Sequence, residues 1–280
     1  MRIQHVIGIA ALAILISQAE ANSQKGVTTM SKKQQVVELL NALESGAAEP
    51  VAIINPNKYI QHNLAVPDGL SGFGEFFSKL PKNSVKVKVI RSFQDGDYGF
   101  AHTQYEFFGP KVGFDIFRFE NGKIVEHWDG LAAIAPANPS GHTQLDGSTE
   151  IKDLDKTETN RKIVTAFIDD ILIHGKVEKL TQYIGEPYIQ HNSGIADGLS
   201  GLGTALEALA KAGIKMVYSK NHKVLAEGNF VLSLSEGEFG GKHVAYYDLF
   251  RLENGKLAEH WDVIEEIPSK DKWANQNGKF

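Results

Sequence analysis

Two short segments place a histidine and an aspartate two residues apart, in a setting that suits acid–base chemistry. His127 and Asp129 lie in the sequence EHWD, which recurs with His260 and Asp262. In a β-strand, residues two apart point to the same face. An imidazole and a carboxylate on one apolar face can transfer protons, because burial raises the pKa of an aspartate toward neutrality. We therefore predict catalytic roles for these four residues. The alternative is that Asp129 ends its strand in a solvated loop and that His127 is a hydrogen-bonded core residue.

The turn before the first EHWD segment predicts how its strand pairs. Asn121-Gly122 is typical of a two-residue type I′ hairpin turn. Counting back from that turn places Ile116 opposite His127 and Phe114 opposite Asp129, so we expect both polar groups beside apolar neighbours. In the second copy the corresponding facing pairs are Leu249 with His260 and Tyr247 with Asp262.

A second polar motif, YIQHN, also occurs twice. In an extended segment, its tyrosine, glutamine and asparagine share one side and its histidine lies on the other. We predict that these side chains contact a ligand. The alternative is a polar loop whose side chains hydrogen-bond the backbone. The predicted ligand-binding residues are Tyr59, Gln61, His62, Asn63, Tyr188, Gln190, His191 and Asn192.

Other chemistries find little support. His62, His127 and Asp129 could converge as a two-histidine, one-carboxylate set, but no short metal spacing such as H-E-x-x-H accompanies them. The absence of cysteine excludes disulfides, thiolate metal sites and cysteine nucleophiles. We predict no metal and no organic cofactor. The net charge of −5 argues against a dedicated nucleic-acid binder.

The motifs belong to a tandem duplication. Residues 59–74 and 188–203 are identical at eleven of sixteen positions, and residues 115–129 and 248–262 at eleven of fifteen. Two long matches in the same order indicate two domain-sized units. The predicted boundaries are a signal peptide at 1–21, a first domain at 30–138, a linker at 139–155 and a second domain at 156–280.

Each unit begins with helices and ends with strands. Val36, Leu39, Leu40 and Leu43 follow a helical period, whereas VKVKV at 85–89 alternates as a strand does. Helices followed by an antiparallel meander predict an α+β fold with helices packed on one face of a sheet.

This order, with YIQHN early and an ENGK–EHWD hairpin late, resembles the SnoaL-like branch of the nuclear transport factor 2-like superfamily. The resemblance covers both units and implies two tandem cone-shaped domains, each with a pocket inside. In SnoaL-like cyclases and related epoxide hydrolases an aspartate near the end of this strand is the acid–base group, and Asp129 and Asp262 match that place. The superfamily includes polyketide cyclases, ketosteroid isomerases, dehydratases, epoxide hydrolases and non-catalytic binders, so the fold does not settle the function.

We expect a small-molecule pocket in each domain and proton transfer next to a carbonyl group, as in aldol cyclisation, isomerisation or dehydration. The alternatives are a binding protein for a small hydrophobic ligand and an interaction role. The expected partner is a small hydrophobic or carbonyl-containing molecule, with no nucleic acid and no membrane after signal cleavage. The two units are expected to form an intramolecular pseudo-dimer, and homo-oligomerisation is left open. The copies differ where Tyr246-Tyr247 replaces Gly113-Phe114 and where Leu234 replaces His102, so we expect differently lined pockets.

The N-terminus predicts export. Arg2 precedes an apolar run at 6–16, and Ala19-Glu20-Ala21 supplies a small-x-small cleavage pattern. The run is too short to span a bilayer, which requires about 20 residues. We predict cleavage after Ala21 and a periplasmic or secreted location.

Overall fold

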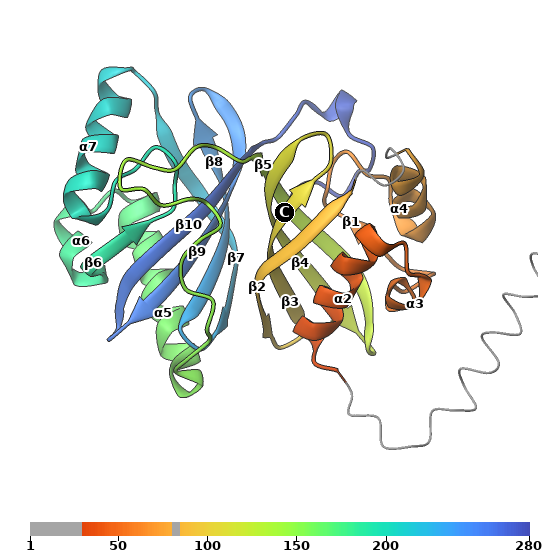
Figure 1. Cartoon of the computed structure of the whole chain (residues 1–280). Coiled ribbons are helices and arrows are strands. Elements are labelled where there is room, and N and C mark those ends of the chain that lie inside the picture. The colour runs from red at the N-terminus through yellow and green to blue at the C-terminus, as the bar shows by residue number, and fades with distance from the viewer. Residues whose placement is uncertain (1–29, 80–84) are drawn as a thin grey trace, which may run out of the picture. The chain divides into compact units, whose positions relative to one another are not determined.

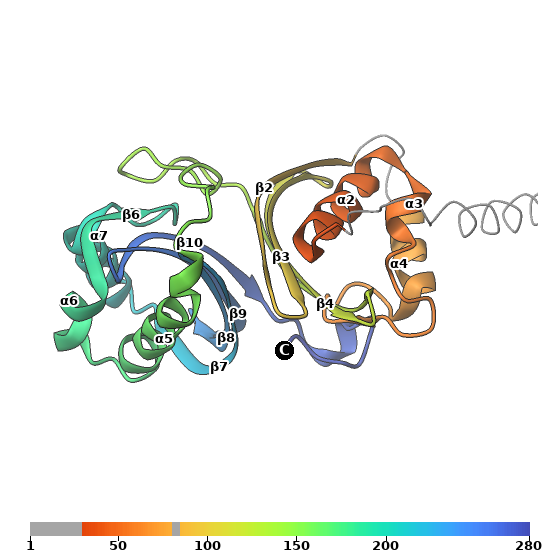
Figure 2. The same cartoon turned by 90° about the horizontal axis from the view of Figure 1, so that it is seen from below.

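The computed structural model describes residues 30–79 and 85–280. The predicted signal peptide lies outside the described residues and stays a prediction. Within them, each repeat forms one five-stranded sheet with its helices on the concave side (Figures 1 and 2). The predicted α+β class is therefore confirmed. None of the described helices is long and apolar enough to cross a membrane.

The first repeat has the strand order β1-β5-β4-β3-β2. The four longer strands form an antiparallel meander, and the short β1 pairs parallel with β5, which adds an edge strand to the predicted meander. Its elements are α2 (Lys32–Ser45), α3 (Ala48–Val51), β1 (Ile60–Gln61), α4 (Gly69–Ser78), β2 (Lys86–Asp95), β3 (Tyr98–Glu106), β4 (Pro110–Glu120) and β5 (Lys123–Ala133).

The second repeat has the equivalent order β6-β10-β9-β8-β7. Its elements are α5 (Thr157–Phe167), a π-helical turn (Ile168–Ile173), α6 (Leu180–Tyr183), β6 (Ile184–Gln190), α7 (Gly198–Lys211), β7 (Met216–Glu227), β8 (Phe230–Phe239), β9 (Lys242–Glu253) and β10 (Lys256–Glu266). Short 3₁₀ turns occupy Leu154–Lys156, Val177–Lys179 and Lys270–Lys272.

Apolar periodicity explains how the first helix packs. Val36, Leu39 and Leu40 of α2 are buried in one cluster with Phe117 and Phe119 of β4. The helix stops at Ser45 because Gly46 follows with a φ of 70°, the left-handed conformation that ends many helices.

Both faces of β4 are buried, which explains its nearly continuous apolar sequence. Phe117 and Phe119 face the helices, whereas Phe114 and Ile116 belong to a core that also contains Leu232 and other residues of the second repeat. Trp128 and Trp261 also lie in this shared core.

The register of β5, the strand that carries His127 and Asp129, differs from the prediction. The turn itself is as expected, with positive φ at Asn121 and Gly122. However, Val125 forms a β-bulge, which shifts every later pair by one residue, so that His127 faces Phe117 and Asp129 faces Asp115. The predicted partners Ile116 and Phe114 are therefore wrong.

The predicted register of the second repeat is wrong for the same reason, because Ala258 forms a bulge. Leu249 and Tyr247 are therefore not the partners of His260 and Asp262. The facing pairs are Phe250 with His260 and Asp248 with Asp262.

Candidate active site

The first repeat encloses a cavity of about 70 Å³ between its helices and the concave face of its sheet. That volume holds several water-sized groups. Leu39, Leu43, Phe73, Phe77 and Leu131 supply much of an apolar wall. The polar residues that line the cavity are Tyr59, Gln61, Asn63, Tyr105, Asp115, His127 and Asp129.

The bulge at Val125 brings a third polar residue, Asp115, beside the predicted pair. The Nε2 atom of His127 lies 3.4 Å from Asp115 Oδ1, and its Nδ1 lies 3.1 Å from Gln61 Oε1. The hydroxyl of Tyr105 donates a hydrogen bond of 2.8 Å to Asp115 Oδ2. The imidazole is thus held at both nitrogens, which fixes the plane of its ring.

Asp115 was missed by the sequence reasoning. One signal was available: an aspartate stands at this place in both copies, at 115 and 248, within an otherwise apolar strand. The register that carries it to Asp129 depends on the bulge, which the turn sequence does not reveal.

The acid–base set is buried. Asp115, His127 and Asp129 have relative exposures of 3%, 8% and 4%. Burial raises the pKa of Asp115, although its hydrogen bond with His127 and the charge of that ring oppose the rise. A proton-transfer site in this cavity is therefore shielded from bulk water.

Two polar atoms of the cavity residues are buried without a hydrogen-bond partner among the described residues. Asn63 donates a bond of 2.6 Å to Asp129 Oδ2, but Asp129 Oδ1 has none, and neither has the hydroxyl of Tyr59. Burial raises the pKa of Tyr59, and the charges of Asp129 and Asp115 add to the rise, so the phenol stays protonated. A carboxylate oxygen and a hydroxyl group without hydrogen-bond partners thus line one largely apolar cavity, and the only charge paired with that oxygen among the described residues is Lys279 at 3.6 Å.

The second repeat repeats the acid–histidine–acid arrangement. His260 Nδ1 lies 2.9 Å from Gln190 Oε1, and its Nε2 lies 3.1 Å from Asp248 Oδ1. Asn192 donates a bond of 2.6 Å to Asp262 Oδ2. Burial raises the pKa of Asp262, while the charge of His260 opposes the rise.

The two repeats line these sites differently, through an exchange of a tyrosine and a glycine. In the first, Tyr105 stands against Gly113, where an added Cβ would lie 2.5 Å from the Tyr105 ring. In the second, Tyr246 stands against Gly237 and stacks on Tyr218 with ring centroids 3.9 Å apart.

That exchange changes which strand carries the tyrosine that donates to Asp115 or to its counterpart Asp248. Asp248 accepts hydrogen bonds of 3.2 and 3.3 Å from the hydroxyl of Tyr218 on β7, whereas Asp115 is held by Tyr105 on β3. In the part of the chain that the structure describes, neither Tyr188 nor Asp262 has a buried side-chain oxygen without a partner.

The histidines of the YIQHN motifs lie away from the first cavity. His62 does not line it, but stacks on Trp128 with centroids 4.6 Å apart and bonds Glu126 at 2.9 Å. His191 stacks on Trp261 in the same way and bonds Glu259. Both histidines thus contribute to the packing of the motif, and their ligand contact stays a prediction.

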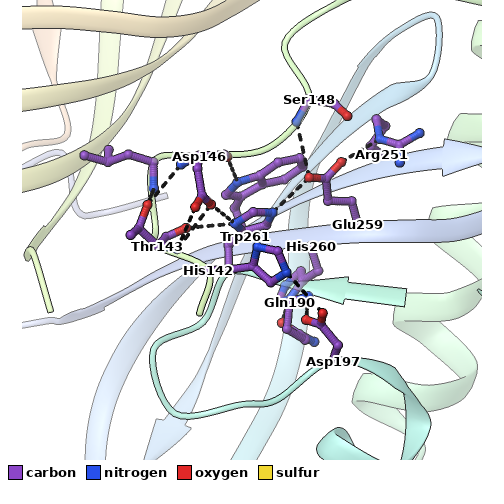
Figure 3. Close-up of polar contacts among 12 residues, drawn as sticks. His142, Thr143, Asp146, Ser148, Gln190, Asp197, Arg251, Glu259, His260 and Trp261 are labelled. Carbon is purple, nitrogen blue, oxygen red and sulfur yellow. Dashed lines mark hydrogen bonds and ion pairs between the residues drawn. The ribbon is translucent and has the colours of Figure 1, made fainter. Parts of the chain in front are cut away.

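The predicted linker forms an ordered strap along the second repeat (Figure 3). The backbone NH of Ser148 donates to Glu259, and the indole NH of Trp261 donates to the carbonyl of Asp146 at 3.0 Å. His142 pairs with Asp197 at 3.1 Å. These contacts hold the segments that carry Gln190 and His260.

Three clusters of described residues have ligand-type atoms within 4.8 Å of one another, a spacing that would admit a cation. They are Asp115, His127 and Asp129; Asp248, His260 and Asp262; and His142, Asp146 and His191. Most of the polar atoms of the first two sets are already engaged with one another and with tyrosine and amide groups. Few of their nitrogen and oxygen atoms are therefore left free to bind a cation.

Fold and site together define each repeat as a cone-shaped α+β domain with an acid–histidine–acid set, which is fully buried in the first repeat and partly buried at Asp262 in the second. The chain is similar in structure to a SnoaL-like polyketide cyclase from Agrobacterium tumefaciens (13% identity, TM-score 0.31), with 38% of this chain and 91% of that chain covered. It is also similar to a putative ketosteroid isomerase from Kribbella flavida (15%, 0.33, covering 42% and 89%). An epoxide hydrolase of the LEH-like type from M. tuberculosis is a further similar structure (20%, 0.31, covering 39% and 85%). No protein-family model matches the sequence, and no curated protein matches it significantly.

Proposed function

We propose that the first repeat binds a small, largely apolar carbonyl compound and moves a proton next to its carbonyl group. Asp129 is the proton acceptor in this proposal, and Tyr59 is the hydrogen-bond donor to the carbonyl oxygen. No cofactor is needed, because the reaction only moves a proton and an electron pair within the substrate.

The unpaired polar atoms carry this proposal. Burying a hydroxyl or a carboxylate oxygen without a partner costs about 1–3 kcal/mol, so native proteins rarely retain such atoms without a purpose. A carbonyl compound satisfies both at once: its oxygen accepts from Tyr59, and its acidic C–H meets Asp129. The surrounding wall is apolar, which suits the rest of a hydrocarbon-bodied ligand.

The chemistry follows from the arrangement. Asp129 Oδ1 takes a proton from the carbon beside the carbonyl, and the C–H electron pair moves to the carbonyl oxygen, where Tyr59 stabilises the developing charge. Asn63 holds the other oxygen of Asp129, so the free oxygen keeps one orientation. Return of the proton from Asp129 to a different carbon gives isomerisation. Attack of the enolate on a second carbonyl, whose oxygen then takes that proton, gives cyclisation. Expulsion of a β-hydroxyl group, which takes the proton and leaves as water, gives dehydration.

The array behind Asp129 supports its role. His127 lies beside it on the strand and is tied to Asp115 and Gln61. A buried imidazole–carboxylate pair next to the reacting acid can relay or retain a proton during turnover. Burial of Asp115, His127 and Asp129 reduces their contact with water, which strengthens each of these interactions.

The test is deuterium uptake. Panels of small cyclic ketones and enones would be incubated in D₂O with the wild-type protein, Asp129→Asn and Asp262→Asn, and exchange beside the carbonyl followed by ¹H NMR. We expect Asp129→Asn to lose about 10²–10⁴-fold of the catalysed rate, since that is what a general base contributes. Asp262→Asn is the matched control and should retain the rate.

Tyr59→Phe refines the test. We expect it to lower the rate by about 10²-fold, because it removes the donor to the oxyanion. Exchange that persists in Asp129→Asn would refute the proposal. Binding of a panel member without exchange by the wild-type protein would instead favour a binding protein without turnover.

A further inference from the structure

We propose that the second repeat completes the site of the first, and that Lys279 is a positioning residue that holds Asp129 in place. This inference rests on the function proposed for Asp129. Lys279 follows β10 in the sequence, so it belongs to the second repeat.

The contacts of Lys279 are with Asp129 and with one other acid. Its ammonium donates a hydrogen bond of 2.6 Å to the backbone carbonyl of Asp129 and lies 3.6 Å from Asp129 Oδ1, the oxygen without a hydrogen-bond partner. It also pairs with Glu265 at 2.5 Å. Lys279 is only 3% exposed, which is rare for a lysine unless it is paired.

The same carbonyl of Asp129 receives a second donor from the second repeat. The hydroxyl of Tyr247 donates to it at 2.7 Å. Two buried donors on one carbonyl fix the backbone at the residue that the proposed reaction uses, and both come from beyond the first repeat.

The segment that carries Lys279 docks on the YIQHN loop. The side-chain amide of Asn275 donates to the carbonyls of Asn63 and Val66, and the carbonyl of Gly278 lies 2.8 Å from His62 Nδ1. This docking places Lys279 and also supports Asn63, which holds the other oxygen of Asp129.

The second site lacks these groups. The linker and the C-terminal segment share the pattern A-N-x-x-G, which aligns Asn138 with Asn275 and His142 with Lys279. His142 bonds Asp197 and not Asp262. Among residues 30–79 and 85–280, Asp262 forms no ion pair. By position in the sheets, Phe114 and Ala132 replace Tyr247 and Glu265.

The charged and titratable groups around Asp129 come from several elements. They are Tyr59 before β1, Tyr105 on β3, Asp115 on β4, His127 on β5, Tyr247 on β9, Glu265 on β10 and Lys279. Lys279 is the one lysine among these seven residues. Burial opposes its charge, but Glu265 and Asp129 raise its pKa, so the ammonium persists.

The test follows the protonation of Asp129 through the side-chain amide of Asn63, and it requires no catalytic turnover. Asn63 donates to Asp129 and Asn192 to Asp262, each at 2.6 Å, so their side-chain NH₂ signals in ¹⁵N NMR report the two acids within one molecule. The pH would be lowered stepwise for the full-length protein, Lys279→Met, Glu265→Gln, Lys279→Met/Glu265→Gln and Lys279→Arg.

We expect removal of the lysine to raise the pH at which the Asn63 signal moves by about one to three pH units, because an opposite charge within 4–6 Å favours a carboxylate by that amount. The reference for Lys279→Met is the wild-type protein. The reference for the double variant is Glu265→Gln, because loss of Glu265 alone also removes a neighbouring negative charge. Lys279→Arg should restore the wild-type midpoint. Lys272→Met removes an exposed charge of the same segment and should change nothing.

The double variant keeps the test decisive if Lys279→Met alone does not fold, because it leaves no unpaired buried acid at 265. Equal Asn63 midpoints in Glu265→Gln and in a folded double variant would overturn the inference. Equal movement of the Asn192 signal would also overturn it, since the effect would then not be local. Failure of deuterium exchange in the wild-type protein would count against the proposed function and leave this measurement standing.

Discussion

Substituting Gly113 by alanine tests how the first site is packed. Gly113 lies on β4, and an added Cβ would lie 2.5 Å from Tyr105 Cε2 and 2.9 Å from Leu131 Cδ2. Real Cβ atoms do not approach other atoms so closely, so the tyrosine ring must move. The ring carries the hydroxyl that donates to Asp115, and the whole group is buried between sheet and helices.

The cost has two parts. Forcing one methyl group into a packed core costs about 1–3 kcal/mol. Loss of the bond from Tyr105 to Asp115 adds about 1 kcal/mol. We therefore expect Gly113→Ala to lower the free energy of unfolding by about 2–4 kcal/mol, which lowers the melting temperature by roughly 4–16 °C in a chain of this size.

Urea and thermal unfolding of the purified protein would measure this loss. Gly74→Ala is the matched control, because no atom lies within 4 Å of its added Cβ and alanine favours a helix, so its stability should stay the same or rise. In a Tyr105→Ala background the cost of Gly113→Ala should fall below about 1 kcal/mol, as the obstructing ring is gone. A neutral Gly113→Ala, or a cost that persists without Tyr105, would refute this account of the packing.

Two further predictions concern His260 of the second repeat and the strap at residues 139–155. Burial lowers the pKa of His260, but its bond to Asp248 and the nearby carboxylates outweigh this and raise it, so the folded state holds that proton more tightly than the unfolded chain. The resulting stability is fully present below the unfolded pKa, about 6.5, and is lost as the pH rises through the folded value. The free energy of unfolding measured with urea should therefore fall less steeply with pH above 6.5 in His260→Gln than in the wild-type protein, whereas substitution of the exposed His243 by Gln should not change this dependence. The same pH dependence in His260→Gln and wild type would contradict the prediction. Arg91→Met should lower stability by about 2–4 kcal/mol and speed proteolysis within 139–155, because its guanidinium bonds three carbonyls of that strap; an uncleaved strap would count against it.

Local sequence signals predicted the elements of each repeat. The apolar spacing of Leu39 and Leu40 predicts α2, and the Asn121-Gly122 turn predicts the hairpin that the positive φ values confirm. Helical period and turn preference depend on neighbouring residues, so they can be read from one short stretch of chain.

Alternation along the YIQHN segment also predicted which side chains lie on the same face. Tyr59, Gln61 and Asn63 line the cavity, and His62 points elsewhere, as period two requires. The duplication could be recognised from the sequence alone, because identical residues at matched spacing require no structure to detect.

The composition of the site was decided by tertiary structure. A bulge at Val125 places Asp115 opposite Asp129, because one extra residue in a strand shifts every later pair by one residue. No local sequence preference marks Val125 as the bulged residue. Lys279 reaches Asp129 from 150 residues away. Such contacts form only when separate sheets and straps pack together, since the stabilisation they bring depends on burial that no single segment can provide.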